Sequence, residues 1–352
     1  SIVLPLTAVV AACVVGVFAD PVGRMLTGPG HGLDDPTIDR LIAGGYSLYF
    51  MLASALMSIL LVVRHTRVEE QSGRAELVRA GPIGRHTTLA ATFVVALVTN
   101  VAAAGALVLA LIGVGGLELH GSLLVGASVT AVGLAFAGIT SVTVQLTEYS
   151  RAAAGLAGGV LGIAFLVRGG GDMARAGGSL LSWLSPLGWA QQTAPYVFDR
   201  WWPLALLVVL AAVTATAGYL LAIRRDLGAG FFAVRPGPPR AHPSLGRPWG
   251  LALRLQRASI IGWTASLGAF GLVLGAFADA MLDASDDLPD VFVDLFGERD
   301  LVAGYLGFMA LFSAIFVAVY AVLAVQGLRD EEIRGRVEPL LAAPPGSGRT
   351  WA

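Results

Sequence analysis

The sequence predicts an all-α polytopic membrane protein with a parallel internal repeat, and three observations support this fold class. Charged residues make up 13% of the 352-residue chain and apolar residues 56%, whereas a soluble domain has about 25% charged residues. Apolar stretches close to the ~20 residues that cross a bilayer recur along the chain. One polar segment also occurs in two similar copies, at residues 68–85 and 330–347.

We expect eight membrane-crossing helices. The first predicted helix has an apolar run like that of a signal peptide, but no basic residues precede the run. Its sequence VVGVFAD (Val14–Asp20) also recurs in mid-chain as VLGAFAD (Val273–Asp279). A signal peptide would have no role in mid-chain, so we predict that both stretches are membrane crossings. The fifth is short and glycine-rich, and it is either a complete tilted crossing or half of a broken one. The approximate ranges are 2–19, 42–63, 87–113, 122–146, 152–168, 202–222, 258–277 and 302–325.

Arginine in the loops predicts the orientation. Of the 23 basic residues, all arginine, 17 lie in four loops that we place in the cytoplasm: 64–86, 147–151, 223–257 and 326–352. The alternate loops are external, and residues 169–200 among them are expected to form a short helix or a re-entrant hairpin. The cytoplasmic stretch 223–257 is a basic, proline-rich linker. It ends either in an interfacial helix or in the basic flank of the next crossing.

The repeat divides the chain into two halves. Each copy runs crossing, external loop, crossing and polar segment. Six crossings separate the two polar segments, so both segments face the cytoplasm in a parallel repeat. Residues 1–222 then form a six-span half with polar segment 64–86, and residues 258–352 form the first two crossings and the polar segment of a second half. Four further crossings, making a probable twelve, are expected beyond these residues.

The polar segment has the same pattern in both copies: Glu-Glu-x-x-Gly-Arg-x-Glu, followed by proline. Glutamate precedes arginine by four residues, which supports a helix, and proline ends it. The competing interpretation is a solvated loop whose arginines only set the orientation of the protein in the membrane. Such a loop would need positive charge but not a repeated pattern of glutamate, glycine and arginine, so we interpret the segment as a docking surface. Its residues are Glu69, Glu70, Gly73, Arg74, Glu76 and Pro82 in the first copy, and Glu331, Glu332, Gly335, Arg336, Glu338 and Pro344 in the second.

With these residues the chain resembles the ABC-2 type exporter permeases. Many of them carry Glu-x-Gly-Thr-x-Glu-x-Leu and then Ser/Thr-Pro in the loop after the second crossing. Here one extra residue separates glutamate from glycine, arginine replaces threonine, and the prolines lack a preceding Ser/Thr. QLTEYSRAAAG at 145–155 and SWLSPLGWAQQ at 182–192 are similar to the actinobacterial branch that exports polyketide antibiotics and other drugs, with two fused six-span halves.

The resemblance implies a type V exporter-like fold and export of amphiphilic drugs, antibiotics or lipid-like molecules across the cell membrane by alternating access. Each polar segment would be a coupling helix seated on a separate ABC ATPase, two copies per permease chain, and those subunits would bind ATP and Mg²⁺. The permease itself would hold no cofactor, no metal and no catalytic residue, and its other partners would be lipids, not nucleic acid. The chain has no lysine, and a P-loop requires one, so no P-loop is encoded here.

The resemblance also places a substrate pathway where the halves meet, with the second and fifth crossings prominent. Aromatic and methionine side chains suit a large amphiphile because they repack around varied shapes. Ordinary helix packing or lipid contact is the competing interpretation. The matching positions are Tyr46, Phe50, Met51, Met57, Tyr305, Phe308, Met309 and Phe312.

Three other functions are open on the sequence alone. An ion-coupled secondary transporter usually keeps an ionisable residue within the membrane, and the predicted crossings contain none clearly inside. A membrane enzyme is disfavoured because the five histidines have no metal-ligand spacing. A ligand-sensing subunit that signals through an ATPase would use the same coupling helices as an exporter, so the sequence does not separate the two.

Overall fold

The structure is a computed structural model that divides into two compact units, Ser1–Arg235 and Pro236–Ala352. The described part of the chain is helical and contains no strand. It comprises residues 21–31, 37–73, 87–225, 230–231 and 248–283, and within the last predicted crossing residues 303, 306–307, 310–311, 313–318, 320–322 and 324–325.

In the first unit, short helices flank the long ones. Two of the short elements, η1 and η2, are π-helical turns at either end of α4, and η3 is a 3₁₀ turn. The elements are α2 (Pro21–Thr27), α3 (Ile38–Leu41), η1 (Ile42–Tyr46), α4 (Ser47–Val63), η2 (Arg64–Val68), α5 (Glu69–Gln71), α7 (Thr87–Gly113), α8 (Leu119–Leu146), α9 (Ser150–Ala174), η3 (Ser182–Leu184), α10 (Pro186–Gln191) and α11 (Pro203–Ile223).

Five helices in the described residues are long and apolar enough to cross a membrane, which confirms an all-α polytopic membrane protein. They overlap the second to sixth predicted crossings, whereas the first, at 2–19, lies outside the described residues. The five are Asp39–Gln71, Thr87–Gly113, Leu119–Leu146, Ser150–Ala174 and Pro203–Ile223.

Two of these helices are longer than predicted. The second crossing does not stop at residue 63 but continues through η2 into α5. The fifth, predicted to be short at 152–168, is one unbroken helix of 25 residues, α9. Its last turn carries Gly169–Gly171, which reads as a loop in the sequence. Burial of Gly169 and Gly171 against Met25 and Ser182 explains the extension, because a Cβ at either glycine would overlap those residues.

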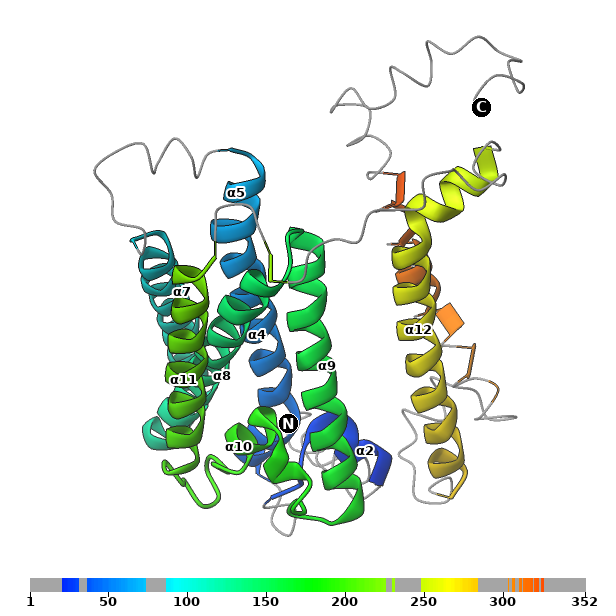
Figure 1. Cartoon of the computed structure of the whole chain (residues 1–352). Helices are drawn as coiled ribbons and strands as arrows, with labels where there is room; N and C mark the ends of the chain where they lie inside the picture. The colour runs from blue at the N-terminus through cyan, green and yellow to red at the C-terminus, as the bar shows by residue number, and fades with distance from the viewer. Residues whose placement is uncertain are drawn as a thin grey trace, which may run out of the picture. The chain divides into compact units, whose positions relative to one another are not determined.

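The second unit contains α12 (Pro248–Asp283) and a shorter apolar helix, Ser313–Val322. They overlap the seventh and eighth predicted crossings. The rings of Trp263 and Tyr320 lie 5.6 Å apart, so the two helices pack side by side. The stretch 248–257, predicted as an interfacial helix or a basic flank, is continuous with α12, and the first turns of α12 lean away from the rest of the helix (Figure 1).

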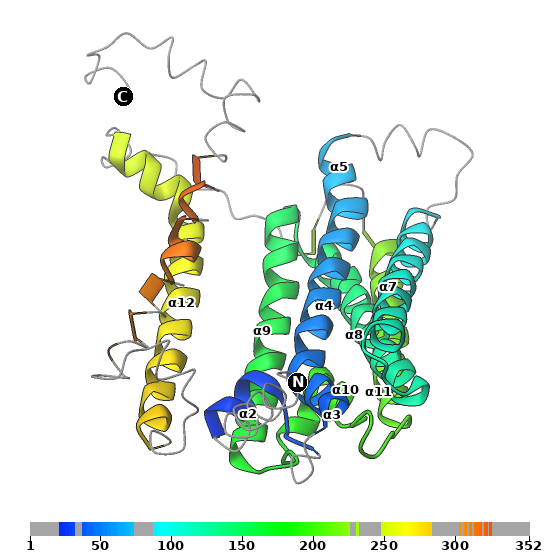
Figure 2. The ribbon, with the colours of Figure 1, turned by 180° about the vertical axis from the view of Figure 1, so that it is seen from behind.

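Helix α8 is the centre of the first unit, and it contacts α4, α7, α9 and α11 (Figure 1 and Figure 2). Small residues make this possible, because they let helix backbones approach closely where lipid offers no hydrophobic drive for association. A Cβ at Gly126 would overlap Val108 of α7, and one at Gly138 would overlap Thr214 and Ala211 of α11.

A polar junction joins α4, α7 and α8 near the middle of the bundle. The carboxamide of Asn100 accepts a hydrogen bond from Ser54 (2.6 Å) and donates to Ser58 (2.9 Å) and to the carbonyl oxygen of Ala96 (2.8 Å). Ser54 is also placed to donate to the carbonyl oxygen of Val129 on α8 (2.9 Å). All of the buried polar atoms of Asn100 are therefore satisfied inside protein, as an apolar surrounding requires.

Gly133 is the position on which this junction depends, since a Cβ there would overlap both Asn100 and Ser54. We expect Gly133→Ala to lower stability by about 1–3 kcal/mol, the usual cost of overpacking. Gly105→Ala is the matched control, because Gly105 is a helical glycine of α7 with open space around it, and alanine there improves helix propensity by about 1 kcal/mol. Thermal unfolding in detergent would compare the two; equal melting temperatures would contradict the packing described.

Candidate functional site

A single carboxylate binds two buried arginines at the end of the bundle that carries α5. Oε1 of Glu70 lies 2.6 Å from Nη2 of Arg225, and Oε2 lies 3.1 Å from Nη1 of the same residue. Oε2 is also 2.9 Å from Nη1 of Arg67. The two-pronged pairing of a guanidinium with a carboxylate is among the stronger hydrogen-bonded arrangements in proteins. We call Arg67, Glu70 and Arg225 the Glu70 cluster.

The Glu70 cluster links the ends of three long helices. Nε of Arg67 donates a hydrogen bond to the carbonyl oxygen of Val144, in the last turn of α8. Arg225 lies two residues past the end of α11. Nearby, Nε2 of Gln71 donates to the carbonyl oxygen of Glu148, between α8 and α9, at 3.2 Å. These bonds connect η2 and α5 to the ends of α8 and α11.

The cluster is withdrawn from solvent. The side chains of Arg67, Arg225 and Glu70 are 1%, 7% and 11% exposed. Removing one member of such a buried pair typically costs about 3–5 kcal/mol, because the remaining charge is left uncompensated. The π-helical turn η2 positions Arg67: the wider turn shifts the helical register, so that Arg67 faces α8 while Arg64 and His65 stay exposed.

Of the residues predicted to couple to an ATPase, the structure describes Glu69, Glu70 and Gly73. The helix ends at Gln71, and Gly73 has φ +76°, a left-handed conformation that glycine adopts without strain. The helix is therefore shorter than predicted and stops before residue 74, and Glu70 pairs with Arg67 and Arg225. The other predicted residues lie outside the described part: Arg74, Glu76, Pro82, Glu331, Glu332, Gly335, Arg336, Glu338 and Pro344.

Three of the predicted substrate-pathway residues are at least partly exposed. Phe50 is exposed and Met57 is half-buried, and their spacing of seven residues within α4 puts them on one side of that helix. Tyr46, at the end of the π-helical turn η1, is exposed as well. Met51 is different: its side chain is fully buried in the core with Leu48 and Phe136. The second-half positions Tyr305, Phe308, Met309 and Phe312 lie outside the described residues.

At the opposite end of the bundle, which carries α10, α9 contains a buried ion pair. Nη1 of Arg168 lies 3.1 Å from Oδ2 of Asp172, one turn further along, and both side chains are at most 1% exposed. Oδ1 of Asp172 accepts a hydrogen bond from the hydroxyl of Ser182 at 2.7 Å. Nη1 of Arg168 also donates to Oε1 of Gln191 at 3.1 Å. The charges are thus compensated within protein.

This ion pair anchors α2 to α9. Nη2 of Arg168 donates to the carbonyl oxygen of Met25, and Nε of Arg24 donates to that of Asp172 at 2.9 Å. Nε2 of Gln191 donates to the carbonyl oxygen of Thr27 at 2.9 Å. The last carbonyl groups of α2, which have no partner within a helix, therefore receive side-chain donors from α9 and α10.

The sequence analysis found no ionisable residue clearly inside a crossing, and Arg168 and Asp172 lie in the last two turns of α9. The pair was overlooked because the predicted crossing ended at residue 168, just before the glycine run. The signal that could have revealed the pair is the spacing of Arg168 and Asp172, four residues apart at the end of an apolar stretch.

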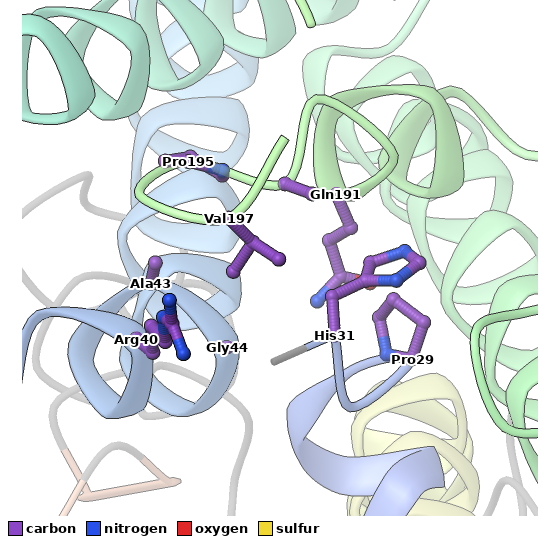
Figure 3. Close-up of a pocket in the computed structure, with 9 residues that line it drawn as sticks. Pro29, His31, Arg40, Ala43, Gly44, Gln191, Pro195 and Val197 are labelled. Carbon is purple, nitrogen blue, oxygen red and sulfur yellow. The ribbon is translucent and has the colours of Figure 1, made fainter. Parts of the chain in front are cut away.

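A small cavity of about 20 Å³ lies beside this network, between the loop after α2, the turn η1 and the loop after α10 (Figure 3). Arg40 and His31 face it from opposite sides, and Gln191 and Val197 complete the wall. Nε2 of His31 donates to Oε1 of Gln192 at 3.2 Å. Burial lowers the pKa of His31 more than this hydrogen bond raises it, so the ring is neutral near pH 7. The cavity has room for about one water molecule.

No cluster of three or more His, Cys, Asp or Glu side chains suited to a metal ion occurs among the residues that the structure describes.

Comparison with known proteins gives two findings. The family described as the multidrug efflux system permease Rv1217c, C-terminal domain, matches residues 4–222 and 245–352. The chain is also 36% identical over 337 residues to the multidrug efflux system permease protein Rv1217c of Mycobacterium tuberculosis (strain ATCC 25618 / H37Rv). The match covers 94% of this chain and 60% of that relative, so the chain spans less than two thirds of the relative's length.

The Arg168–Asp172 pair gives a direct test of the α9 geometry. We expect Asp172→Asn to lower stability by about 3–5 kcal/mol, because it leaves the arginine buried without a counter-charge. The double variant Arg168→Gln with Asp172→Asn should recover part of the loss, as coupled residues do. Glu118→Gln, the same chemical change at an exposed residue, is the control. Thermal unfolding of the purified protein would show these differences, and additive effects of the two single changes would contradict a pair.

Proposed function

The chain belongs to the family of the C-terminal domain of the multidrug efflux system permease Rv1217c, and from that premise we propose that it is the transmembrane permease part of an ATP-driven ABC exporter. In this proposal it moves amphiphilic drugs, antibiotics or lipid-like molecules out of the cell by alternating access. The relative's name describes it as a multidrug efflux system permease. We propose in addition that this chain has the same role, that ATP drives it, and that it is of the ABC-2 type.

The energy would come from a separate chain. No P-loop can be formed without lysine, and the sequence contains none. The two copies of the polar segment would each hold one ABC ATPase subunit, two per permease, with ATP and Mg²⁺ bound there. The chain would then be a transport subunit, not an enzyme.

The Glu70 cluster is the observation that best supports a coupling role for the first polar segment. Glu70 follows the second crossing directly, and its carboxylate is engaged by Arg67 and Arg225. It is therefore a positioning residue: it fixes α5 to the ends of α8 and α11, while Glu69 and the residues that follow Gly73 would meet the ATPase. Closure of two ATPase subunits would pull both segments, and the cluster would pass the movement to the bundle.

The substrate pathway is proposed to run along the face of α4 that α8 leaves uncovered. Phe50 and Met57 lie on this face, and Tyr46 is exposed just before it in η1. Met51, predicted with them, would support α4 from the core side and would not touch the substrate.

The buried Arg168–Asp172 pair favours one alternative, an ion-coupled secondary transporter, because ionisable residues within a membrane often relay protons. The local bonding favours a structural role instead. Both carboxylate oxygens of Asp172 are engaged, one by Arg168 and one by Ser182, and the pair holds backbone carbonyl groups of α2.

Co-purification with ATPase candidates tests the proposal. We would express the full-length permease with the proteins encoded beside it and ask whether a Walker-A-containing subunit binds in a two-to-one ratio and hydrolyses ATP when substrate is added. Glu70→Ala with Glu332→Ala should reduce substrate-stimulated hydrolysis at least about tenfold, because movement would no longer reach the bundle. Glu118→Ala, at an exposed residue outside both segments, should leave it unchanged.

Two results would contradict the proposal. If the variant Glu70→Ala with Glu332→Ala kept full substrate-stimulated ATP hydrolysis, the two glutamates of the polar segments could not link the ATPase to the permease. A permease that purifies alone and moves solute down an ion gradient, with transport lost in Asp172→Asn, would establish the ion-coupled alternative.

A further inference from the structure

Two adjacent glutamates follow directly after the π-helical turn η2. The turn ends at Val68, and Glu69 and Glu70 are the first residues of α5. The two-pronged bond to Arg225 uses the carboxylate of Glu70 alone. The π-helical turn suggests a role for the neighbouring glutamate, because it determines which of the two faces Arg225.

A π-helical turn contains about one residue more than an α-helical turn. If η2 changed to an α-helix while α4 kept its place, each later residue would advance to the position that the next residue occupies now. One residue of an α-helix corresponds to a rotation of about 100° and a rise of about 1.5 Å. After this change Glu69 would stand where Glu70 stands in the structure, opposite the guanidinium of Arg225.

The residues of η2 fit the second register as well as the first. Thr66 would move to the position of Arg67, beside the carbonyl oxygen of Val144 that now accepts a hydrogen bond from Arg67. The hydroxyl of Thr66 is also a donor, so this buried acceptor could again be satisfied. Arg67 would leave its buried position for that of Val68, which is 41% exposed, where water can solvate the charge.

The residues of α5 fit both registers too. Glu69 is half-buried and already has interactions of its own, which it would exchange for those of Glu70. Glu70 would move to the exposed position of Gln71. Arg225, 7% exposed, would therefore face a carboxylate in either register, and no charge would be left buried without a partner, which is the costly arrangement.

We propose that η2 is a two-register joint between α4 and α5. In the π register Glu70 binds Arg225, as in this structure, and in the α register Glu69 binds it instead. The change would rotate α5 relative to α4 without breaking its connection to the end of α11. This deepens the coupling role proposed above and rests on it only for the driving force, which movement of the ATPase would supply.

A matched pair of adjacent substitutions tests the two registers. Glu69→Gln removes the carboxylate that the α register needs, and Glu70→Gln removes the one that the π register needs. Spin labels at Ser72→Cys, directly after α5, and at Ala90→Cys, in the first turn of α7, would report the rotation, and both positions are exposed. The single cysteine of the chain, Cys13, would first be replaced by alanine. Double electron–electron resonance on the full-length permease in detergent, without ATPase, would measure the distance between the labels.

We expect Glu69→Gln to keep one narrow distance and Glu70→Gln to shift to a second narrow distance. The label at residue 72 should move by up to roughly 10 Å, because a helix with its side chains is about 10–12 Å across and would turn by about 100°. Glu118→Gln, the same chemical change at an exposed residue elsewhere, should leave the distance of the unchanged protein.

Deletion of His65, an exposed residue of η2, gives a second test. It removes the additional residue, so the turn becomes α-helical while Glu70 stays opposite Arg225. The label distance should equal that of Glu69→Gln, and adding Glu70→Gln should no longer shift it. Deletion of Leu60, which is exposed but lies within the regular helix α4, is the control. It should lower the melting temperature much more, because it moves the last core residues of α4 out of register.

One distance shared by Glu69→Gln and Glu70→Gln would overturn the proposal. A shift in Glu70→Gln that persists after His65 is deleted would also overturn it, because α5 would then have loosened without changing register. The result separates from that of the co-purification experiment. A second register in a permease that recruits no ATPase would keep the joint and reject ATP-driven export, whereas intact ATP coupling with a single register would keep the exporter and reject the joint.

Discussion

Close approach of helices to α8 is the constraint on which the rest of the first unit depends. In a lipid surrounding, apolar side chains gain little by leaving lipid for protein, so helices must gain from tight packing and from hydrogen bonds between them. Gly126, Gly133 and Gly138 bring α7, α4 and α11 against α8. The Asn100 junction forms only because Gly133 leaves room for it. A larger residue there would separate the helices and strand polar atoms in an apolar interior.

Both ends of the bundle contain buried charges, and at both ends these charges are neutralised in a similar way. At each end a carboxylate and an arginine are buried together: Glu70 with Arg67 and Arg225, and Asp172 with Arg168. Each arginine network also caps backbone carbonyl groups, that of Val144 at one end and that of Met25 at the other. The middle of the bundle relies on neutral polar groups, where lone charges would be most costly. The charged connections between helices are thus at the ends, and the neutral ones are in the middle.

The sequence predicted five crossings that the structure bears out, because apolar length is a strong signal, and Thr87–Gly113 agrees with its predicted range of 87–113. Element ends were less predictable. Gly169–Gly171 has the composition of a loop, yet tertiary packing against α2 and η3 keeps it helical. At the candidate site, the pattern drew attention to Glu70 but not to its partner Arg225. Arg225 is 155 residues away in sequence, and no local spacing rule relates such positions. Met51 shows a further limit, since residue type did not distinguish a core side chain from its exposed neighbours.

The π-helical turns η1 and η2 at the ends of α4 have a consequence for how this crossing is mapped. A π-helical turn accommodates about one additional residue per turn, so the angular phase of the side chains jumps wherever one occurs. A single helical wheel drawn over Asp39–Gln71 would therefore assign residues on either side of α4 to the wrong face. A scan of this helix with spin labels or reactive probes would follow one periodicity across Ser47–Val63 and a displaced one beyond each turn. The same holds for aligning the two copies of the repeat. Wherever a π-helical turn occurred in one copy alone, the residue numbers of the two copies would have to be offset by one from that turn onward.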